Sequence, residues 1–418
     1  MRMQLQEQQA PQRICLWDWI LVVGVVLSPM NELRIGKVGP GEALVLLWCL
    51  RYLSRLFTLS LKDMLPRFWL SFLMVISLGT GFCVIFYPKE STPGSLATYV
   101  FFALISCSIM TGLSERSSRQ IRRLLYSVGI LTAFWYTFLY YYSLNISYYF
   151  HDAELWYHGV RFSGGANNPH QLATLMGSAI FLNIIHVADR DCSLPDKILP
   201  LICTGLCFYV SLQIKSSTLV VTTLVTFAAF LYFLSLKNLS TRSQKWLVTS
   251  VLVIVFSVLI GLFREKLFDY VFDFVESDAN GLGRFEIFAS ISDSLRKNWL
   301  FGLGPGIHGL DGTIEYHNAY LEILAMGGII GLGIFIVFSS RLFPLLMTDP
   351  SILFAVIPFY AYGLGGFSMR RLSFWVVVAV AAAYSVRKKQ ETAADSGAPA
   401  PRQAAGLPGN KRGLYLKT

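Results

Sequence analysis

Charged residues are scarce in this chain of 418 residues, where they make up only 14% of the positions and hydrophobic residues make up 54%. Soluble domains carry roughly 25% charged residues. This scarcity therefore excludes a soluble protein and indicates a polytopic membrane protein. The net charge of +10 does not point to nucleic acid, because the basic residues lie between apolar segments and act there as topology signals. We expect no nucleic-acid partner.

Cysteine spacing also excludes some kinds of site. The seven cysteines lie nearly all in apolar segments, without a CxxC or other metal-type spacing. We expect no disulfide, no metal site and no cofactor. The first apolar segment is followed by Ser28-Pro29-Met30, which is a poor signal-peptide cleavage site, so we expect a retained first helix.

Long apolar runs are abundant, and twelve of them predict transmembrane helices, although 39–50 and 372–386 are short. The twelve lie near 14–30, 39–50, 68–87, 97–113, 124–144, 169–188, 198–214, 217–236, 246–263, 318–338, 352–368 and 372–386. With both chain ends in the cytoplasm, the cytoplasmic loops hold 14 of the 35 Lys and Arg residues, the N-terminal arm two and the tail seven, against 12 in the outer segments. Lys and Arg are thus more frequent on the predicted cytoplasmic side, as is typical of short inner loops.

The first polar motif of the outer segments runs from Arg161 to Asn168-Pro169-His170. Asn168 suits the cap of a helix and Pro169 its first position, so a helix should begin here. Taken alone, the pattern fits two interpretations equally. It is either a loop with a good helix start or an anion site, in which Arg161 and helix N–H groups bind a phosphate.

The second motif, Lys215-Ser216-Ser217, separates two apolar segments and leaves almost no loop. Lys215 must therefore lie at the outer membrane surface. It either extends its charge to the interface, as interfacial lysines commonly do, or serves as a cation for an anionic substrate.

The third motif begins at Arg284, which opens an amphipathic helix with Phe285, Phe288, Ile291 and Leu295 at helical spacing. Such a helix should lie on the membrane surface.

The same segment reaches His317-Asn318 directly before another apolar run, with Glu322 one turn after Asn318. A lone interfacial histidine is most often a satisfied polar residue. It is also the side chain that can take a proton near neutral pH. We expect His317 to be a general base, with His170 and His308 as rival histidines and Glu322 as the next candidate.

Arg161, Lys215, Arg284 and His317 come from distant parts of the chain and fall on one predicted side of the bilayer. Cations suit the headgroup of a lipid-linked diphosphate, and a base suits an attacking sugar hydroxyl. A flippase or other transporter is an alternative, but transporters place ionisable residues within their spans, and these spans have few.

Several short motifs then follow one another in a characteristic order across residues 155–340. They are Arg161 with Gly164, Asn168-Pro169, Gly283-Arg284, Pro305 flanked by Gly302, Gly304 and Gly306, His317-Asn318 with Tyr320-Leu321, and Gly327-Gly328-Ile329-Ile330-Gly331. In this order the chain resembles the O-antigen ligase and O-antigen polymerase superfamily of bacterial inner-membrane glycosyltransferases.

The resemblance implies a metal-independent, inverting transfer of a glycan from undecaprenyl diphosphate to an acceptor sugar on the periplasmic side. It implies His317 as the base, with Arg284, Arg161 and Lys215 around the diphosphate. Asn168, Asn318, Tyr320 and Glu322 complete the expected substrate-binding set. Similar proteins commonly carry Ser-Arg at the hairpin where this chain has Lys215, and lysine supplies a point charge without the planar fork of arginine. Either Lys215 substitutes for that arginine or Arg161 holds more of the diphosphate.

We therefore expect an all-α polytopic membrane protein of about twelve transmembrane helices, GT-C-like, with a cavity that opens to the periplasm. Residues 1–386 should form one integral-membrane domain with a long periplasmic loop at 264–317. Residues 387–418 should form a disordered basic cytoplasmic tail.

Ligase activity, with lipid A-core as the acceptor, is favoured because the chain is compact and basic. A polymerase would instead join two lipid-linked repeat units with the same chemistry. Both would work among the lipids of the bacterial inner membrane.

Overall fold

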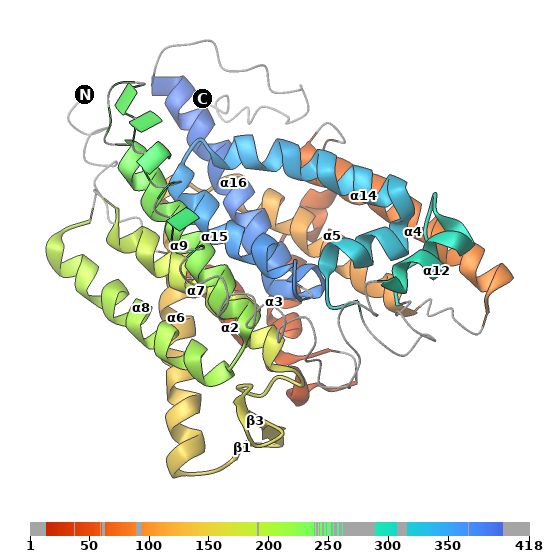
Figure 1. Ribbon diagram of the computed structural model, residues 1–418, viewed down its shortest axis with the longest axis horizontal. Coiled ribbons are helices and arrows are strands. Elements are labelled where there is room, and N and C mark those ends of the chain that lie inside the picture. Colours follow the sequence, from red (N-terminus) through yellow and green to blue (C-terminus); the bar gives the residue numbers. More distant parts are fainter. Residues whose placement is uncertain are drawn as a thin grey trace, which may run out of the picture.

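The structure, a computed structural model, describes residues 14–36, 38–58, 60, 63–88, 94–189, 192–237, 289–306, 316–366 and 368–395, with scattered positions between 239 and 261. Helices dominate this part of the chain (Figure 1). They are α2 Leu16–Leu27, α3 Pro40–Leu50, α4 Met64–Phe86, α5 Gly94–Leu113, α6 Ser118–Asn145, α7 Pro169–Val187, α8 Leu194–Ile214, α9 Ser217–Lys237, α12 Ile291–Asn298, α14 Ala319–Leu346, α15 Pro350–Tyr362 and α16 Leu372–Asp395.

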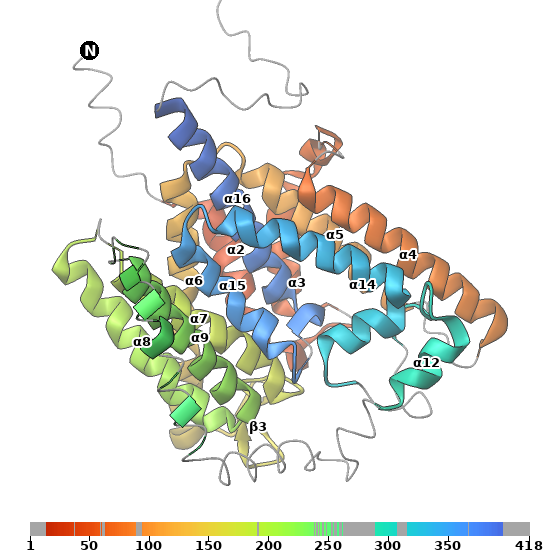
Figure 2. The same ribbon diagram turned by 45° about the horizontal axis from the view of Figure 1, so that its top comes forward.

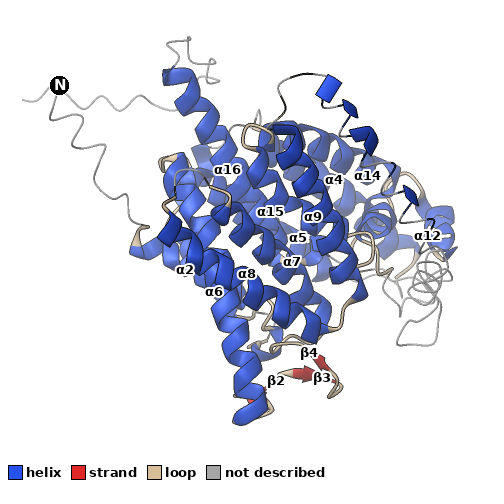
Figure 3. Ribbon diagram, turned by 60° about the vertical axis from the view of Figure 1, so that its left-hand side comes forward, coloured by secondary structure: helices blue, strands red, loops and turns tan. Residues whose placement is uncertain are grey.

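The remaining regular elements are short. Among the described residues there are three 3-10 turns, η1 Asn31–Leu33, η2 Leu53–Thr58 and η3 Ser368–Arg370. Two antiparallel strand pairs follow α6, β1 Tyr149–Phe150 with β2 Ala153–Glu154 and β3 Trp156–Tyr157 with β4 Arg161–Phe162. Figure 3 shows these strands gathered at one end of the helix bundle.

The expected all-α polytopic membrane fold is confirmed. Within the described residues, seven helices are long and apolar enough to cross a membrane, namely α4, α5, α6, α7, α8, α9 and α14. Eleven of the twelve predicted segments contain a described helix, and half of the residues of 246–263 lie outside the described residues. However, α2 and α3 have only 12 and 11 residues, whereas a span needs about 20. The count of twelve spans stays a prediction.

Helix α7 lies at the centre of its half of the bundle, packed by α6, α8, α9 and α15 (Figures 1 and 2). Its side chains are buried along almost the whole helix. This burial explains why its polar residues have partners inside the protein. Ser178 donates to the carbonyl of Ala355 in α15 at 2.8 Å, and Asn183 donates to Gly129 in α6 at 3.1 Å. Because α7 begins at Pro169, a rigid helix supports the first predicted motif.

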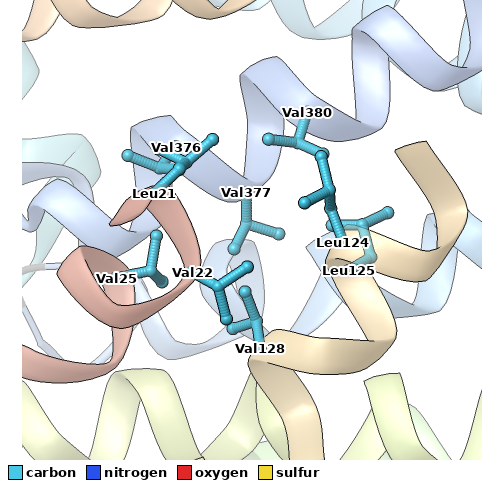
Figure 4. Close-up of a pocket in the computed structure, with 9 residues that line it drawn as sticks. All are labelled: Leu21, Val22, Val25, Leu124, Leu125, Val128, Val376, Val377 and Val380. Atoms are coloured by element: carbon cyan, nitrogen blue, oxygen red, sulfur yellow. The ribbon is translucent and has the colours of Figure 1, made fainter. Parts of the chain in front are cut away.

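Apolar side chains fill the spaces between the other helices. An aromatic cluster joins α4, α14 and α16, where the ring of Phe68 stacks on Phe338 at 4.3 Å between centroids and Trp69 meets Trp375 at 4.4 Å. A cavity of about 10 Å³ lies among α2, α6 and α16 (Figure 4). Only leucine and valine side chains line it. An apolar void of this size stays dry, so it is a packing defect and not a substrate site.

Helix α14 is broken at Gly328, which the sequence pattern did not predict. Gly328 has φ 59° and ψ −163°, inside an otherwise helical run. Figures 1 and 2 show the ribbon of α14 changing direction part of the way along the helix. The break removes backbone hydrogen bonds from a membrane helix, and in lipid each such group needs a partner within the protein.

The segment 299–304 supplies those partners. Leu303 and Gly304 donate to the carbonyls of Ala325 and Met326 at 2.9 and 3.0 Å, and the N–H groups of Ile329 and Ile330 donate to Trp299 and Leu300 at 2.9 and 3.3 Å. This segment, which we call the glycine turn because Gly302 and Gly304 have positive φ angles, thus completes the broken helix. Helix α12 precedes this turn and accounts for the second half of the expected amphipathic helix, while 284–288 lie outside the described residues.

At the opposite end of the bundle, polar side chains connect the helix ends. Asp349 accepts hydrogen bonds from Tyr384 at 2.6 Å and from Lys388 at 2.7 Å, and Ser118 donates to Glu391. These contacts carry α16 on to Asp395. The expectation of a disordered tail from residue 387 is therefore corrected for 387–395, because side-chain contacts that the composition does not reveal stabilise the last turns. Residues 396–418 lie outside the described residues.

Candidate active site

The start of α7 has the predicted geometry. Asn168 is the helix cap, its side-chain oxygen accepts from the N–H of His170 at 2.9 Å, and Pro169 is the first helical residue. This confirms the helix start that the Asn-Pro pair predicted. The capped end points its remaining N–H groups toward the same end of the bundle as the two strand pairs, which makes it a suitable place for negative charge.

The hairpin between α8 and α9 is as short as predicted. Lys215 is exposed and adopts the left-handed conformation at φ 51°, and α9 begins two residues later. Such a backbone is uncommon for residues other than glycine, asparagine and aspartate, and it costs about 1–3 kcal/mol. The surrounding structure holds Lys215 in this conformation at the apex of the hairpin.

Arg161 lies against this hairpin. Its Nε donates to the carbonyl of Ile214 at 3.2 Å, so the guanidinium is next to the residue that precedes Lys215. Partial burial lowers the pKa of Arg161. Because the ordinary pKa of an arginine side chain is far above 7, the guanidinium keeps its charge. The structure thus brings together two of the predicted cations, which are 54 residues apart in the chain.

Tyr362, at the end of α15, connects these two elements. Its hydroxyl is hydrogen bonded to Nδ1 of His170 at 2.5 Å and to the Ser216 hydroxyl at 3.4 Å. The ring is 1% exposed. We call Arg161, His170, Lys215, Ser216, Asn318 and Tyr362 the polar cluster.

Asn318 joins the polar cluster through the loop that follows Tyr362. It caps α14, accepting from the N–H groups of Tyr320 and Leu321 at 3.0 and 3.1 Å. Its amide also donates to Leu364 at 3.0 Å. The predicted start of this helix is thereby confirmed. His317, directly before the cap, is half-buried and left-handed at φ 49°, so two of the predicted functional residues have this uncommon backbone.

Tyr320 and Glu322 make contacts within the protein. The Tyr320 hydroxyl donates to the carbonyl of Tyr360 in α15 at 2.7 Å. Glu322 is 5% exposed and forms an ion pair with Arg370 of η3. A buried carboxylate needs such a partner, and this pair holds the first turn of α14 against the chain between α15 and α16.

The sequence patterns missed Tyr362 and Arg370. Arg370 had a usable signal, because Arg370-Arg371 interrupt two apolar runs on the predicted outer side. Tyr362 had none, as it is one aromatic residue in an apolar helix. Arg284 and His308 lie outside the described residues. Within the described part of the chain, no group of three or more His, Cys, Asp and Glu side chains is arranged to hold a metal ion.

Removing the Tyr362 hydroxyl tests its structural role. Tyr362→Phe should lower the free energy of unfolding by about 1 kcal/mol, because His170 and Ser216 lose a buried hydrogen-bond partner. Thermal unfolding of the detergent-solubilised protein measures this. Tyr148→Phe, at an exposed hydroxyl that donates to Trp156, is the matched control. Equal unfolding midpoints for the two variants would contradict this role for Tyr362.

Comparison with known families places this geometry in context. Residues 199–336 match the family model described as O-antigen ligase (Wzy_C). The match runs from α8 to the middle of α14 and includes Lys215, Arg284 and His317. A search of curated proteins found no match. The family match confirms the resemblance to the O-antigen ligase and polymerase superfamily, and it supports glycosyl transfer involving lipid-linked glycans by a multi-pass membrane protein.

Proposed function

We propose that this protein transfers a glycan from undecaprenyl diphosphate to lipid A-core on the periplasmic side of the bacterial inner membrane, as an O-antigen ligase. The observation that carries the proposal is the meeting of Arg161 and Lys215 beside the capped starts of α7 and α14, in a chain whose residues 199–336 match the O-antigen ligase family. Cations and helix N-termini together bind phosphate groups.

Each residue has a proposed role in the reaction. Arg161, Lys215 and Arg284 hold the diphosphate and stabilise the negative charge that develops as it leaves. His317 takes the proton from the attacking hydroxyl of the acceptor. Asn168 and Asn318 hold the ends of α7 and α14 in place, and their amides contribute to substrate binding.

We propose that Tyr320 and Glu322 keep the start of α14 in position. Both make contacts within the protein, and these contacts orient the turn that follows His317. Glu322 stays the second candidate base, should its pair with Arg370 open when the substrate binds.

Purified protein provides the test. Incubated with undecaprenyl-diphosphate glycan and lipid A-core, a ligase forms glycosylated lipid A-core, whereas a polymerase forms longer lipid-linked glycans from the donor alone. Glycosylated lipid A-core is the expected product. Chain extension of the donor without modified lipid A-core would instead assign polymerase activity. If neither product formed, the proposed glycosyl transfer would be overturned.

The charge of Lys215 can be tested separately from its backbone conformation. Lys215→Arg should keep most of the transfer activity, because it keeps a cation and has the same left-handed backbone cost, whereas Lys215→Ala should lose activity. Arg284→Ala should likewise lose more than Arg284→Lys. Transfer assays at matched protein levels measure these differences. Complete loss in Lys215→Arg would show that lysine makes a specific structural contact.

Orientation in the membrane is a further prediction. Single cysteines at position 119, in the first turn of α6, and at the exposed Val160 should differ in labelling by an impermeant maleimide in spheroplasts. The label should reach position 160 and not position 119, relative to the parent chain with its native cysteines. The reverse pattern would place the polar cluster in the cytoplasm and contradict the periplasmic site.

A further inference from the structure

A second cavity, of about 270 Å³, lies between α4 and α14, at the start of α4 and in the last turns of α14. This is the end of α14 away from its capped start in the polar cluster. Figure 2 shows the two helices side by side, and the stacked rings of Phe68 and Phe338 confirm their contact. The lining residues are Met64, Arg67, Phe68, Ser71, Gly333, Ile334, Val337, Phe338 and Arg341.

The lining combines an apolar wall with two cations. Phe68 and Phe338 are 4% and 2% exposed and form the inner wall. Arg67 and Arg341 both line the cavity and are exposed. No acidic residue is among the lining residues. This chemistry suits a molecule with an anionic head and a hydrocarbon chain.

The position of the arginines in the helices fits the membrane interface. Arg67 is the fourth residue of α4, and Arg341 is five residues before the end of α14. Both α4 and α14 are, over their full lengths, apolar and long enough to cross a bilayer. Ile336 and Val337 are 56% and 51% exposed on the surface beside the cavity. The cavity therefore faces the hydrocarbon of the bilayer, with its cations at headgroup level.

Gly333 lines the cavity without a side chain of its own. A Cβ atom at this position would meet nothing within 4 Å, so close helix packing does not require glycine here. Glycine lowers helix stability relative to alanine. The surface of α14 at Gly333 leaves room for an acyl chain inside the cavity.

From this combination we propose that the cavity binds one anionic phospholipid, with its phosphate held between Arg67 and Arg341 and one acyl chain lying over Gly333. Basic pockets between membrane helices at the cytoplasmic surface bind lipid headgroups in this way. The site is separate from the polar cluster and does not depend on the proposed transfer reaction.

Lipid retention measured by native mass spectrometry tests the charged part of the site. The protein in detergent is titrated with phosphatidylglycerol, phosphatidylcholine or glycerol 3-phosphate. Parent protein should bind one phosphatidylglycerol in preference to the other two ligands. Arg67→Gln/Arg341→Gln should weaken this binding about 25-fold, since each interfacial arginine contributes about fivefold. Arg119→Gln/Lys389→Gln removes two exposed cations elsewhere and should bind as the parent does.

A second pair of variants tests the apolar part. Gly333→Leu keeps both arginines but fills the cavity, and it should also abolish the tightly bound phosphatidylglycerol. Gly81→Leu, at a glycine of α4 that also has open space around it, should leave the binding of phosphatidylglycerol unchanged. Equal binding by parent and Arg67→Gln/Arg341→Gln would overturn the proposal. Full binding of phosphatidylglycerol by Gly333→Leu would also overturn it, because surface charge alone would then explain the binding. Equal binding of glycerol 3-phosphate and phosphatidylglycerol would overturn it as well, because the cavity would then be a site for free phosphate.

Discussion

Replacement of His317 by asparagine is expected to lower the rate of glycan transfer by about 10²- to 10⁴-fold, the contribution of a positioned general base. His317 directly precedes the cap of α14 and has a left-handed backbone at φ 49°. Asparagine tolerates that backbone better than most residues, so the variant removes the proton acceptor and leaves the turn intact. The rate is measured with purified protein, undecaprenyl-diphosphate glycan and acceptor.

Three other histidines serve as controls for His317. His158 has nearly the same backbone, at φ 48°, in the turn between β3 and β4, so His158→Asn makes the same chemical change on the same kind of turn. We expect it to keep the parent rate. His170→Ala should keep most activity, since its Nδ1 is hydrogen bonded to Tyr362, and so should His308→Ala. A parent-like rate for His317→Asn would exclude His317 as the base and make Glu322 the next residue to test.

Replacement of Gly328 by alanine is expected to prevent stable folding. Its φ of 59° with ψ of −163° belongs to a backbone region that is essentially restricted to glycine, where strain alone costs about 1–3 kcal/mol. A Cβ atom would also lie 2.3 Å from the carbonyl oxygen of Leu300. Segment 299–304 would have to move away, and the broken helix would lose its hydrogen-bond partners inside the membrane.

The matched control lies five residues further along the same helix. Gly333→Ala adds the same methyl group where nothing lies within 4 Å, and helix propensity favours alanine by about 0.5–1 kcal/mol. The yield of monodisperse protein and its thermal unfolding midpoint should fall sharply for Gly328→Ala and stay the same or rise for Gly333→Ala. Equal behaviour of the two variants would show that the break in α14 is not needed for folding.

The break also affects the candidate site. Residues 319–327 form a separate short helix that is held at one end by the Asn318 cap and at the other by the glycine turn. Glu322, in the middle of this short helix, is paired with Arg370. His317 is therefore attached to a short element fixed at three points, which suits a catalytic group that must stay in position.

The starts of α7 and α14 were predictable from the sequence because capping is local. In both places an asparagine accepts hydrogen bonds from N–H groups two or three residues ahead, and those partners are visible in the sequence itself. The hairpin at Lys215 was predictable for a similar reason. Two apolar runs with almost no residues between them must be joined by a very short turn at the membrane surface. Composition alone established an all-α membrane protein, because a bilayer admits few other structures.

Only the tertiary structure decided how these local elements meet. The bonds from Tyr362 to His170 and Ser216 join residues 192 and 146 positions apart, and no spacing rule relates side chains so distant. The break at Gly328 was equally hidden, because the GGIIG run is apolar enough for an unbroken span. It depends on N–H and carbonyl groups of residues 299–304. The glycines there mark a turn in the sequence, but nothing in the sequence shows that this turn pairs with the middle of α14. Local hydrogen bonds and apolar length thus determine where helices begin and turn, whereas the site between them depends on packing among segments that the chain order keeps apart.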